Sequence, residues 1–416
     1  MKKLINSVFG IVSVAKNGSH LDGKIHFRYL GAVDHTILNL KERDWKLNDN
    51  TIVVGYKLST GDGEFIQIDL SKDKIVLQSD CFGSLFLYYA EFDGSFIFGT
   101  EINDLLIYSK EFLSINTEEL YRYFAFGFHT FSGKLFYQPI NYLKSNSVLT
   151  VRVGSKRKLD VSTYKLEREF DYDGYADATA NEILQDGIVK RVKHLDLDKI
   201  VFTVSAGLDS GILLESFCQL DIPVVCVTNG FSDSDDVLIG RKRSEICKYK
   251  HIHYGNFYNL SRDEIKNLLL EYVINSGGIG PIAEAEFLLF LKYICQYGKA
   301  IIHGIGGEFY RNRYPSEEYF MANYLTTNET VSKYVFGDYH KEKYLNLINE
   351  TYNQDVWGNA FEKFYLEERH PNNVCVNKNH MIRPYGMFLS PLVNKHLHSF
   401  VFSKSKLGKR TSGEVL

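Results

Sequence analysis

The sequence predicts an α/β protein of two domains, a β-rich N-terminal domain and a C-terminal domain built on a parallel sheet. A length of 416 residues makes two domains the natural expectation. The first third contains short apolar runs separated by Gly, Asp and Ser, which is typical of strands joined by turns. The second half alternates apolar strands with helical patterns, which favours a parallel sheet covered by helices on both faces.

Strand and turn signals dominate the N-terminal part. Four runs are expected to be strands, at 51–56, 64–70, 74–77 and 95–98. Asp93-Gly94 lies between the runs 85–92 and 95–99, and such a dipeptide between apolar runs indicates a hairpin. Residues 117–126 have the pattern of a helix.

A polar, charged stretch from Gly154 to Asp173 is the expected domain boundary. It gives a first domain at 1–153 and a second at 174–416. The alternative is a surface loop inside a single domain.

Strands and helices alternate after this boundary. Strands are expected at 200–204, 223–228 and 299–303, and helices from about residue 210, at 237–248, 261–274 and 283–297. The loops Ser205–Ser210 and Gly304–Glu308 each follow a strand. Because ligands of parallel sheets lie beyond the carboxyl ends of the strands, these loops are the candidate site.

Composition excludes several classes of protein. A net charge of −3 gives no field that would attract nucleic acid or an anionic membrane. The six cysteines are Cys81, Cys218, Cys226, Cys247, Cys295 and Cys375. None forms a CxxC or a zinc-type pair, so we expect reduced core cysteines in a cytoplasmic protein.

The N-terminus could be mistaken for an export signal. Lys2 and Lys3 precede an apolar stretch at 4–15, but Asn6, Ser7 and Gly10 interrupt it. No later stretch is long enough to span a bilayer. We therefore expect neither export nor a membrane partner.

The loop after the strand 200–204 carries the clearest chemical signal. Small residues let backbone N–H groups approach an anion, and the following helix adds its dipole. The predicted nucleotide contacts here are Val204, Ser205, Ala206, Gly207, Leu208, Asp209 and Ser210. Asp209 would repel phosphate, so its expected role is to hold Mg²⁺. The alternative is an ordinary strand–turn–helix capped by Asp209.

This loop resembles the SGGxDS signature of the PP-loop ATP pyrophosphatases, with Ala206 in place of the first glycine. Further segments resemble asparagine synthetases in the expected order: 80–89 (DxxGxxPLYY), 98–102 (FASEI), 123–127, 135–136 and 140–149, 303–308 (SGEGxDE) and 391–394 (VPFLD). The resemblance implies a class II glutamine-amidotransferase-like sandwich followed by a PP-loop domain. It also implies ATP and Mg²⁺ as cofactors, with cleavage of ATP to AMP and pyrophosphate.

The same resemblance suggests roles in the second loop. Glu308 would share Mg²⁺ with Asp209, Gly304 and His303 would contact the nucleotide, and Val227 would lie against adenine. The alternatives are a solvated carboxylate at Glu308 and plain strand core at Val227.

The glutaminase nucleophile of the family is missing. Asn6 occupies the slot of its N-terminal Cys, and an amide cannot perform acyl transfer. The chain is therefore similar to the branches without glutaminase, the β-lactam synthetases and lasso-peptide cyclases. Phe231–Asp236 and the Gly306-Gly307 pair are most similar to the lasso-peptide cyclases.

The base and the late lysine of the family are the open positions. Ile305 stands in the base slot, so Tyr310 and His303 are the nearby candidates, with packing as the alternative. Lys406 or Lys409 would neutralise developing charge, unless both belong to a basic tail and the catalytic Lys is absent.

Two hypotheses of different class follow. The first is an AMP-forming amide ligase or cyclase that acts on a peptide or small-molecule carboxylate, with a leader-peptide-binding protein or a protease as a further partner. The second is a nucleotide-binding pseudoenzyme that serves as a scaffold. An ammonia-dependent asparagine synthetase-like ligase is a third.

Overall fold

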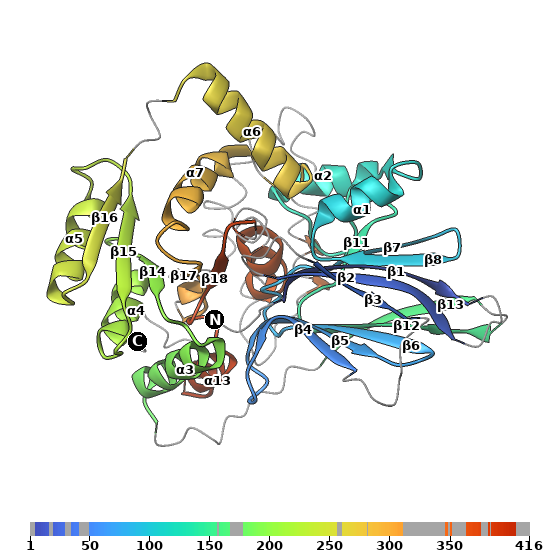
Figure 1. Cartoon of the computed structure of the whole chain (residues 1–416), viewed down its shortest axis with the longest axis horizontal. Helices are drawn as coiled ribbons and strands as arrows, with labels where there is room; N and C mark the ends of the chain where they lie inside the picture. The colour runs from blue at the N-terminus through green and yellow to red at the C-terminus, as the bar shows by residue number, and fades with distance from the viewer. Residues whose placement is uncertain are drawn as a thin grey trace.

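The computed structural model describes most of the chain. The described residues are 5–15, 20–29, 35–40, 50–155, 158–166, 178–255, 260–280, 282–310, 346–347, 350–351, 363–375, 382 and 384–404. Two antiparallel sheets lie on one side of the molecule, and a parallel sheet with its helices lies on the other (Figure 1). The α/β class is thereby confirmed. The finer assignment of the two halves to an amidotransferase-like domain and a PP-loop domain stays a prediction.

Two sheets form a sandwich in the N-terminal half. The six-stranded sheet has the order β11 (Asn141–Tyr142), β7 (Tyr88–Phe92), β8 (Ser95–Gly99), β1 (Ile5–Val14), β2 (Leu21–Tyr29) and β3 (His35–Asn39). The five-stranded sheet has the order β13 (Leu159–Lys165), β12 (Ser147–Val153), β6 (Lys74–Ser79), β5 (Gly63–Leu70) and β4 (Thr51–Lys57). Inward side chains of both sheets, such as Val8, Ile66 and Leu77, share one core.

The apolar N-terminal stretch is a central strand of this sandwich. Strand β1 pairs with β2 on one side and with β8 on the other. The predicted hairpin is confirmed, since β7 and β8 pair antiparallel around Asp93 and Gly94, both with positive φ. The predicted helix at 117–126 coincides with α2 (Thr117–Phe126), beside α1 (Ile102–Ser109) and the short pair β9 (Ser114–Ile115) and β10 (Tyr137–Gln138).

Part of the expected linker belongs to a sheet. Strand β13 lies inside the polar stretch 154–173, and it pairs along its whole length with β12. It is an edge strand, and its C-terminal half is exposed, so its sequence carries little apolar signal. The five-stranded sheet therefore continues to Lys165, inside the stretch in which the domain boundary is expected.

The C-terminal sheet is parallel throughout. Its order is β16 (Lys250–Tyr254), β15 (Val224–Asn229), β14 (Ile200–Thr203), β17 (Ala300–Ile302) and β18 (Met387–Leu389). The helices around it are α3 (Ala180–Leu195), α4 (Leu208–Cys218), α5 (Asp235–Ile246), α6 (Arg262–Ser276), α7 (Ala285–Ile294) and α13 (Lys395–Lys404). None of the described helices is both long enough and apolar enough to cross a membrane.

A buried polar network joins the two halves. Arg191 of α3 is only 2% exposed, and its guanidinium donates to Asp62 at 2.8 Å and to the Tyr56 hydroxyl at 3.0 Å. That hydroxyl donates to Glu64 at 2.9 Å, and Glu64 also accepts the backbone N–H of Ser390. Burial raises the pKa of Glu64 to about 7.

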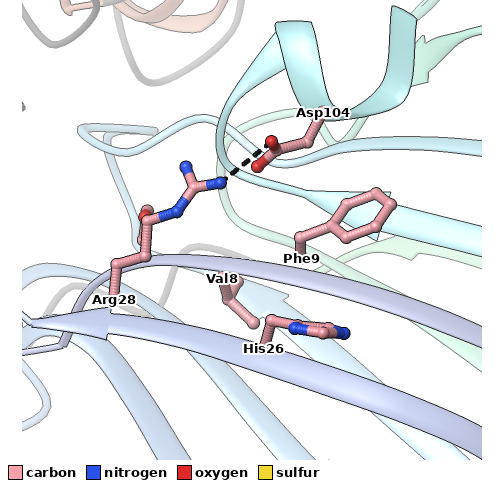
Figure 2. Close-up of a pocket in the computed structure, with 6 residues that line it drawn as sticks. Val8, Phe9, His26, Arg28 and Asp104 are labelled. Carbon is pink, nitrogen blue, oxygen red and sulfur yellow. Dashed lines mark hydrogen bonds and ion pairs between the residues drawn. The ribbon is translucent and has the colours of Figure 1, made fainter. Parts of the chain in front are cut away.

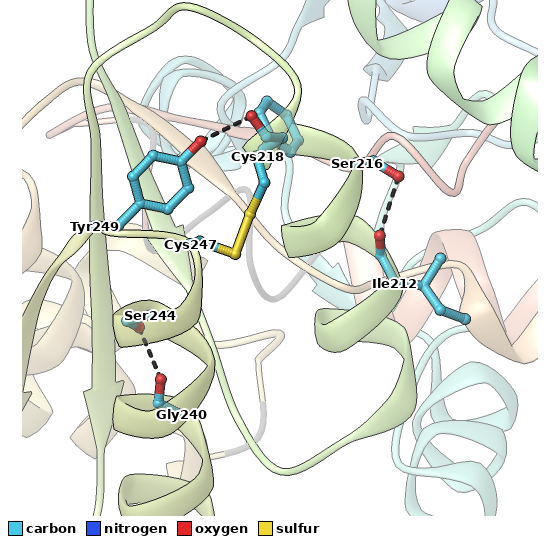
Figure 3. Close-up of a disulfide and its surroundings, with 8 residues drawn as sticks. Ile212, Ser216, Cys218, Gly240, Ser244, Cys247 and Tyr249 are labelled. Atoms are coloured by element: carbon cyan, nitrogen blue, oxygen red, sulfur yellow. Dashed lines mark hydrogen bonds between the residues drawn. A yellow bond between two sulfur atoms is a disulfide. The ribbon is translucent and has the colours of Figure 1, made fainter.

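The expectation of reduced cysteines is wrong for one pair. Cys218, at the end of α4, and Cys247, just after α5, form a disulfide (Figure 3). Helices α4 and α5 follow the neighbouring strands β14 and β15, so their carboxyl ends come side by side. The two cysteines are 29 positions apart, and nothing in that spacing indicates the bond. The other four cysteines form no disulfide.

Candidate functional site

The loop Ser205–Ser210 follows β14 directly and leads into α4. The hydroxyls of Ser205 and Ser210 are 3.0 Å apart. The Ser205 hydroxyl accepts the N–H of Gly207 at 3.2 Å, while the Ser210 hydroxyl donates to the Gly207 carbonyl at 3.0 Å. The two serines thus form the base of the loop and fix the path of the chain around Gly207.

The helix that begins at this loop lacks a side-chain cap. Gly207 is its N-cap residue and has no side chain that could accept from the first N–H groups of the helix, whereas Thr179 and Ser261 form capping boxes on α3 and α6. The first N–H groups of a helix have no partner within the helix, and an anion can accept from them. Gly207 and Leu208 are exposed, so a ligand could reach this end of α4.

The second glycine-rich loop touches the first. A Cβ at Gly304 would lie 3.3 Å from the Asp209 Cβ, and a Cβ at Gly307 would collide with the Asp209 carboxylate. Gly306 has a φ of +96°, a conformation that other residues rarely adopt. The glycines of this loop therefore allow the Asp209 side chain to lie directly against the backbone of the second loop.

Glu308 follows Gly307 in the same loop. Its carboxylate accepts the N–H of Gly306 at 3.2 Å, and its side chain is partly exposed. Among the described residues, no group of three His, Cys, Asp or Glu side chains is placed to hold a metal ion. Mg²⁺ commonly takes one or two carboxylates together with substrate phosphates, so Asp209 and Glu308 fit that donor set.

The remaining predicted nucleotide contacts lie in or next to the sheet. Val204 and Val227 are buried, and the N–H of Val204 donates to the Val227 carbonyl at 3.0 Å. The N–H of His303 donates to the Leu389 carbonyl, and its ring packs edge-on against Phe388.

Tyr310, one of the two candidates for proton transfer, is enclosed by the protein. Tyr310 is 2% exposed, its hydroxyl donates to the Leu392 carbonyl at 2.5 Å, and burial raises its pKa. This is the geometry of the packing alternative. Ile305 lies in the hydrophobic core. Lys406 and Lys409 lie outside the described residues.

Two residues of α5 contact the first loop: Asp236, the last residue of the segment 231–236 noted in the sequence, and Arg243, which the sequence did not suggest. The Asp236 carboxylate accepts the N–H of Ala206 at 2.8 Å. The Arg243 guanidinium donates to the carbonyls of Ser205 at 2.5 Å and of Gly207 at 2.8 Å. The only sequence signal is their spacing of seven positions, which puts both on one face of α5.

Asp80 is the first residue of the segment 80–89 that resembles asparagine synthetases. Its carboxylate is occupied by hydrogen bonds within the protein. The buried Asp80 carboxylate accepts the N–H groups of Phe65, Phe82 and Ser84 and the hydroxyl of Ser84. Burial raises its pKa to about 6, against the lowering effect of these hydrogen bonds. Asp80 therefore supports the turn at the end of β6.

A small cavity lies on the outer face of β1 and β2, next to the position of Asn6. It has a volume of about 160 Å³ and is lined by Ser7, Val8, Phe9, His26, Arg28 and Asp104 (Figure 2). Arg28 and Asp104 form an ion pair at 3.0 Å across it. Asn6 itself lies where the pairing of β1 with β2 is irregular.

Comparison with known proteins gives weak similarities. No protein-family model and no curated protein matches the sequence. Similar solved structures include NMN synthetase from Francisella tularensis, at 13% identity and a TM-score of 0.24, over 32% of this chain and 56% of that one. Glutamine-dependent NAD+ synthetase from Acinetobacter baumannii, in complex with ADP, matches at 10% identity and a TM-score of 0.23, over 71% and 59%.

A third similar structure is glutamine phosphoribosylpyrophosphate amidotransferase from B. subtilis, complexed with ADP and GMP. It matches at 9% identity and a TM-score of 0.19, over 60% of each chain. The chain thus spans less than two thirds of the length of each of these three proteins. Similarities at such TM-scores are too weak to support any conclusion about the fold or the function of this chain.

Proposed function

We propose that this chain is an ATP-dependent ligase that adenylates a carboxylate and then forms an amide. The observation that carries the proposal is the contact between the two loops, in which Asp209 lies against Gly307 at the uncapped start of α4. This arrangement offers hydroxyls, N–H groups and carboxylates at the carboxyl ends of β14 and β17, where parallel sheets bind ligands.

In the proposed complex, the first loop binds the β- and γ-phosphates. Ser205 and Ser210 would donate hydrogen bonds from their hydroxyls, and the N–H groups at the start of α4 would donate to the remaining phosphate oxygens. Gly304 would contact the adenosine through its backbone, and Val227 would form part of the wall against adenine. When bound, Mg²⁺ held by Asp209 and Glu308 would neutralise charge on the phosphates.

The reaction follows from this orientation. With the β- and γ-phosphates held in the loop, the α-phosphorus faces the acceptor. A carboxylate oxygen of the substrate attacks it, the bond to the bridging oxygen breaks, and pyrophosphate leaves with the electron pair. An amine then attacks the acyl carbon, AMP leaves with its electron pair, and the amine nitrogen loses a proton. A kinase-like transfer is disfavoured because the loop has no Walker Lys.

The amine must come from a source other than glutamine. Asn6 in the nucleophile slot motivates this part of the proposal. We propose an intramolecular amine of a peptide or small-molecule substrate, as in lasso-peptide macrocyclases, because tethering raises its effective concentration greatly. A leader-peptide-binding protein or a protease would then be the accompanying partner. Incubation of the purified protein with glutamine should release no ammonia above background.

The test measures which nucleotide product forms. We would incubate the full chain with α-labelled ATP, Mg²⁺ and candidate carboxylate peptides, and follow carboxylate-dependent exchange of labelled pyrophosphate into ATP. AMP formation and exchange are expected, and Asp209→Asn should reduce both at least a hundredfold with an unchanged unfolding midpoint. Asp186→Asn, an exposed carboxylate on α3, is the matched control. Labelled ADP would overturn the proposal.

One observation favours a second candidate, a nucleotide-binding pseudoenzyme. The base slot holds Ile305, a core residue that cannot transfer a proton, and the Tyr310 hydroxyl is committed to a backbone carbonyl. A scaffold of this kind would bind ATP tightly and yield no AMP with any substrate. The exchange experiment above separates the two candidates.

A further inference from the structure

We propose that Arg243 is a positioning residue for the loop Ser205–Ser210, and that the Cys218–Cys247 disulfide holds α5 where this contact requires it. The inference deepens the proposed function, since it concerns how the phosphate-binding loop obtains its shape. Arg243 touches the backbone of the loop rather than the expected ligand, so it acts through the loop.

The peptide bond between Ser205 and Ala206 is held at both ends by α5. Its carbonyl accepts from Arg243, and its N–H donates to Asp236. Because a trans peptide is planar and its C=O and N–H point in opposite directions, two contacts at opposite ends fix its orientation. Asp236 and Arg243 are seven positions apart, about 10 Å along the helix, so the peptide lies between them.

The second contact of Arg243 helps to orient the first N–H of α4. The Gly207 carbonyl accepts from Arg243 as well as from the Gly211 N–H and the Ser210 hydroxyl, and the N–H of Leu208 belongs to the same peptide plane. Holding the carbonyl on the α5 side points the Leu208 N–H away from α5, toward the open start of α4. Arg243 thus orients a donor that the proposal assigns to phosphate.

Close packing against α4 makes the contact specific. The guanidinium carbon of Arg243 lies 2.9 Å from where a Cβ at Gly211 would be, so any larger residue at this position would displace the guanidinium. The geometry therefore depends on the spacing between α4 and α5, and a small shift of either helix would break both hydrogen bonds.

The disulfide sets that spacing one helical turn from Arg243. The N–H of Cys247 donates to the Arg243 carbonyl, and the Tyr249 hydroxyl donates to the Phe217 carbonyl beside Cys218 (Figure 3). Cys218 is exposed, so a small reductant can reach the bond. Reduction by a dithiol or a phosphine adds two electrons and two protons to give two thiols, and the reductant is oxidised in turn. Helix α5 is then tied to α4 by non-covalent contacts alone.

The first test compares two arginines of the same helix. Arg243→Gln should weaken binding of Mg·ATP about tenfold by calorimetry, because two hydrogen bonds from a charged donor are lost. It should also speed amide hydrogen exchange across residues 205–210. Arg241→Gln is the matched control, an exposed position beside His251, and should change neither. Arg243→Lys keeps the charge and should recover part of both effects.

Each outcome is informative. If Arg243→Gln lowers the unfolding midpoint while loop exchange and affinity stay as in the wild type, Arg243 is merely structural and the proposal is wrong. If the wild-type chain binds no ATP, the proposed function fails, whereas exchange at 205–210 in the free protein still tests the positioning role.

The second test concerns the disulfide. Treatment of the wild type with a phosphine reductant should speed exchange at 205–210 and weaken Mg·ATP binding severalfold, less than loss of the Arg243 side chain. The double variant Cys218→Ser with Cys247→Ser should start at the reduced level and ignore the reductant. Identical affinity and exchange with and without reductant would refute the role of the disulfide.

Discussion

Two polar regions of this molecule are built in opposite ways. At the junction of the halves, Arg191, Asp62, Tyr56 and Glu64 are buried and satisfy one another. At the carboxyl end of β14, the loop Ser205–Ser210 leads into α4, and the first residues of this helix are exposed. Side chains of α5 hold the backbone of the loop by hydrogen bonds. A buried network whose polar groups all bond to one another stabilises the fold. A loop that is held by a neighbouring helix can instead leave its own N–H groups available for a ligand.

The largest effect is expected from breaking the junction. Arg191→Met removes the partner of Asp62 and leaves a buried charge unpaired, which should cost about 3–5 kcal/mol of the free energy of unfolding. Urea denaturation measures the loss. Lys190→Met is the control, since it removes an exposed pair with Asp186 and should cost under about 1 kcal/mol. If Arg191→Met left stability unchanged but abolished ATP binding, the junction would serve ligand binding rather than the fold, and the contrast between the two regions would be wrong.

Titration of Glu64 should give the next largest effect. Burial raises its pKa from 4.5 to about 7, so the folded chain binds a proton that the unfolded chain releases between these values. Stability from this group is therefore full below pH 4.5 and is lost as pH rises to about 7. At about 1.4 kcal/mol per pKa unit the loss is about 3 kcal/mol.

Glu64→Gln tests this sign. The amide cannot titrate, so the variant should lack the part of the decline between pH 4.5 and 7 that the wild type shows in urea denaturation. Parallel stability curves for the two proteins over this range would mean that Glu64 keeps an ordinary pKa in the folded state.

A smaller loss is expected at Tyr56. Its hydroxyl donates to Glu64 and accepts from Arg191, so Tyr56→Phe leaves two buried groups each short of a partner. The cost should be about 1–3 kcal/mol. Tyr164→Phe is a suitable comparison, because this exposed tyrosine lies on the edge strand β13 and should be neutral. A neutral Tyr56→Phe would imply that the junction relaxes around the missing hydroxyl.

Sequence periodicity predicted the strongly apolar strands and helices better than it predicted the strands that pair beside them. Residues 117–126 and the strands 200–204 and 223–228 were predicted nearly to the residue. The two strands are buried along nearly their whole length, so each appears in the sequence as a continuous apolar run. The edge strands β13 and β16 were missed, since neither has a strongly buried face. The short strand β18 was also missed, although it is fully buried.

The candidate site divides in the same way. The two loops were found because small residues after an apolar strand carry a local signal, and the structure brings Asp209 and Gly307 together. The disulfide and the contacts of Arg243 and Asp236 with the loop were not predicted, because each depends on where α5 lies relative to α4. Contacts of this kind are set by the packing of whole helices, which a single sequence does not record.

The smallest effect is expected from substitution of Asp236. This substitution tests whether the loop Ser205–Ser210 can be altered without loss of stability, unlike the buried network around Arg191. Its carboxylate holds the N–H of Ala206 and lies on the exposed side of the loop. Asp236→Asn keeps an oxygen that can accept this N–H, so stability should change by no more than about 0.5 kcal/mol.

The substitution removes a negative charge near the proposed phosphate site, where surface interactions are worth about 0.5 kcal/mol, so Mg·ATP should bind about twofold tighter. The gain should shrink as salt is raised, because the interaction is screened. Calorimetry at low and high ionic strength measures both effects, with Asp233→Asn as the control. A weaker affinity instead would mean that the Asp236 carboxylate helps to hold the cation, and the loop would then bind its ligand with three acidic side chains rather than two.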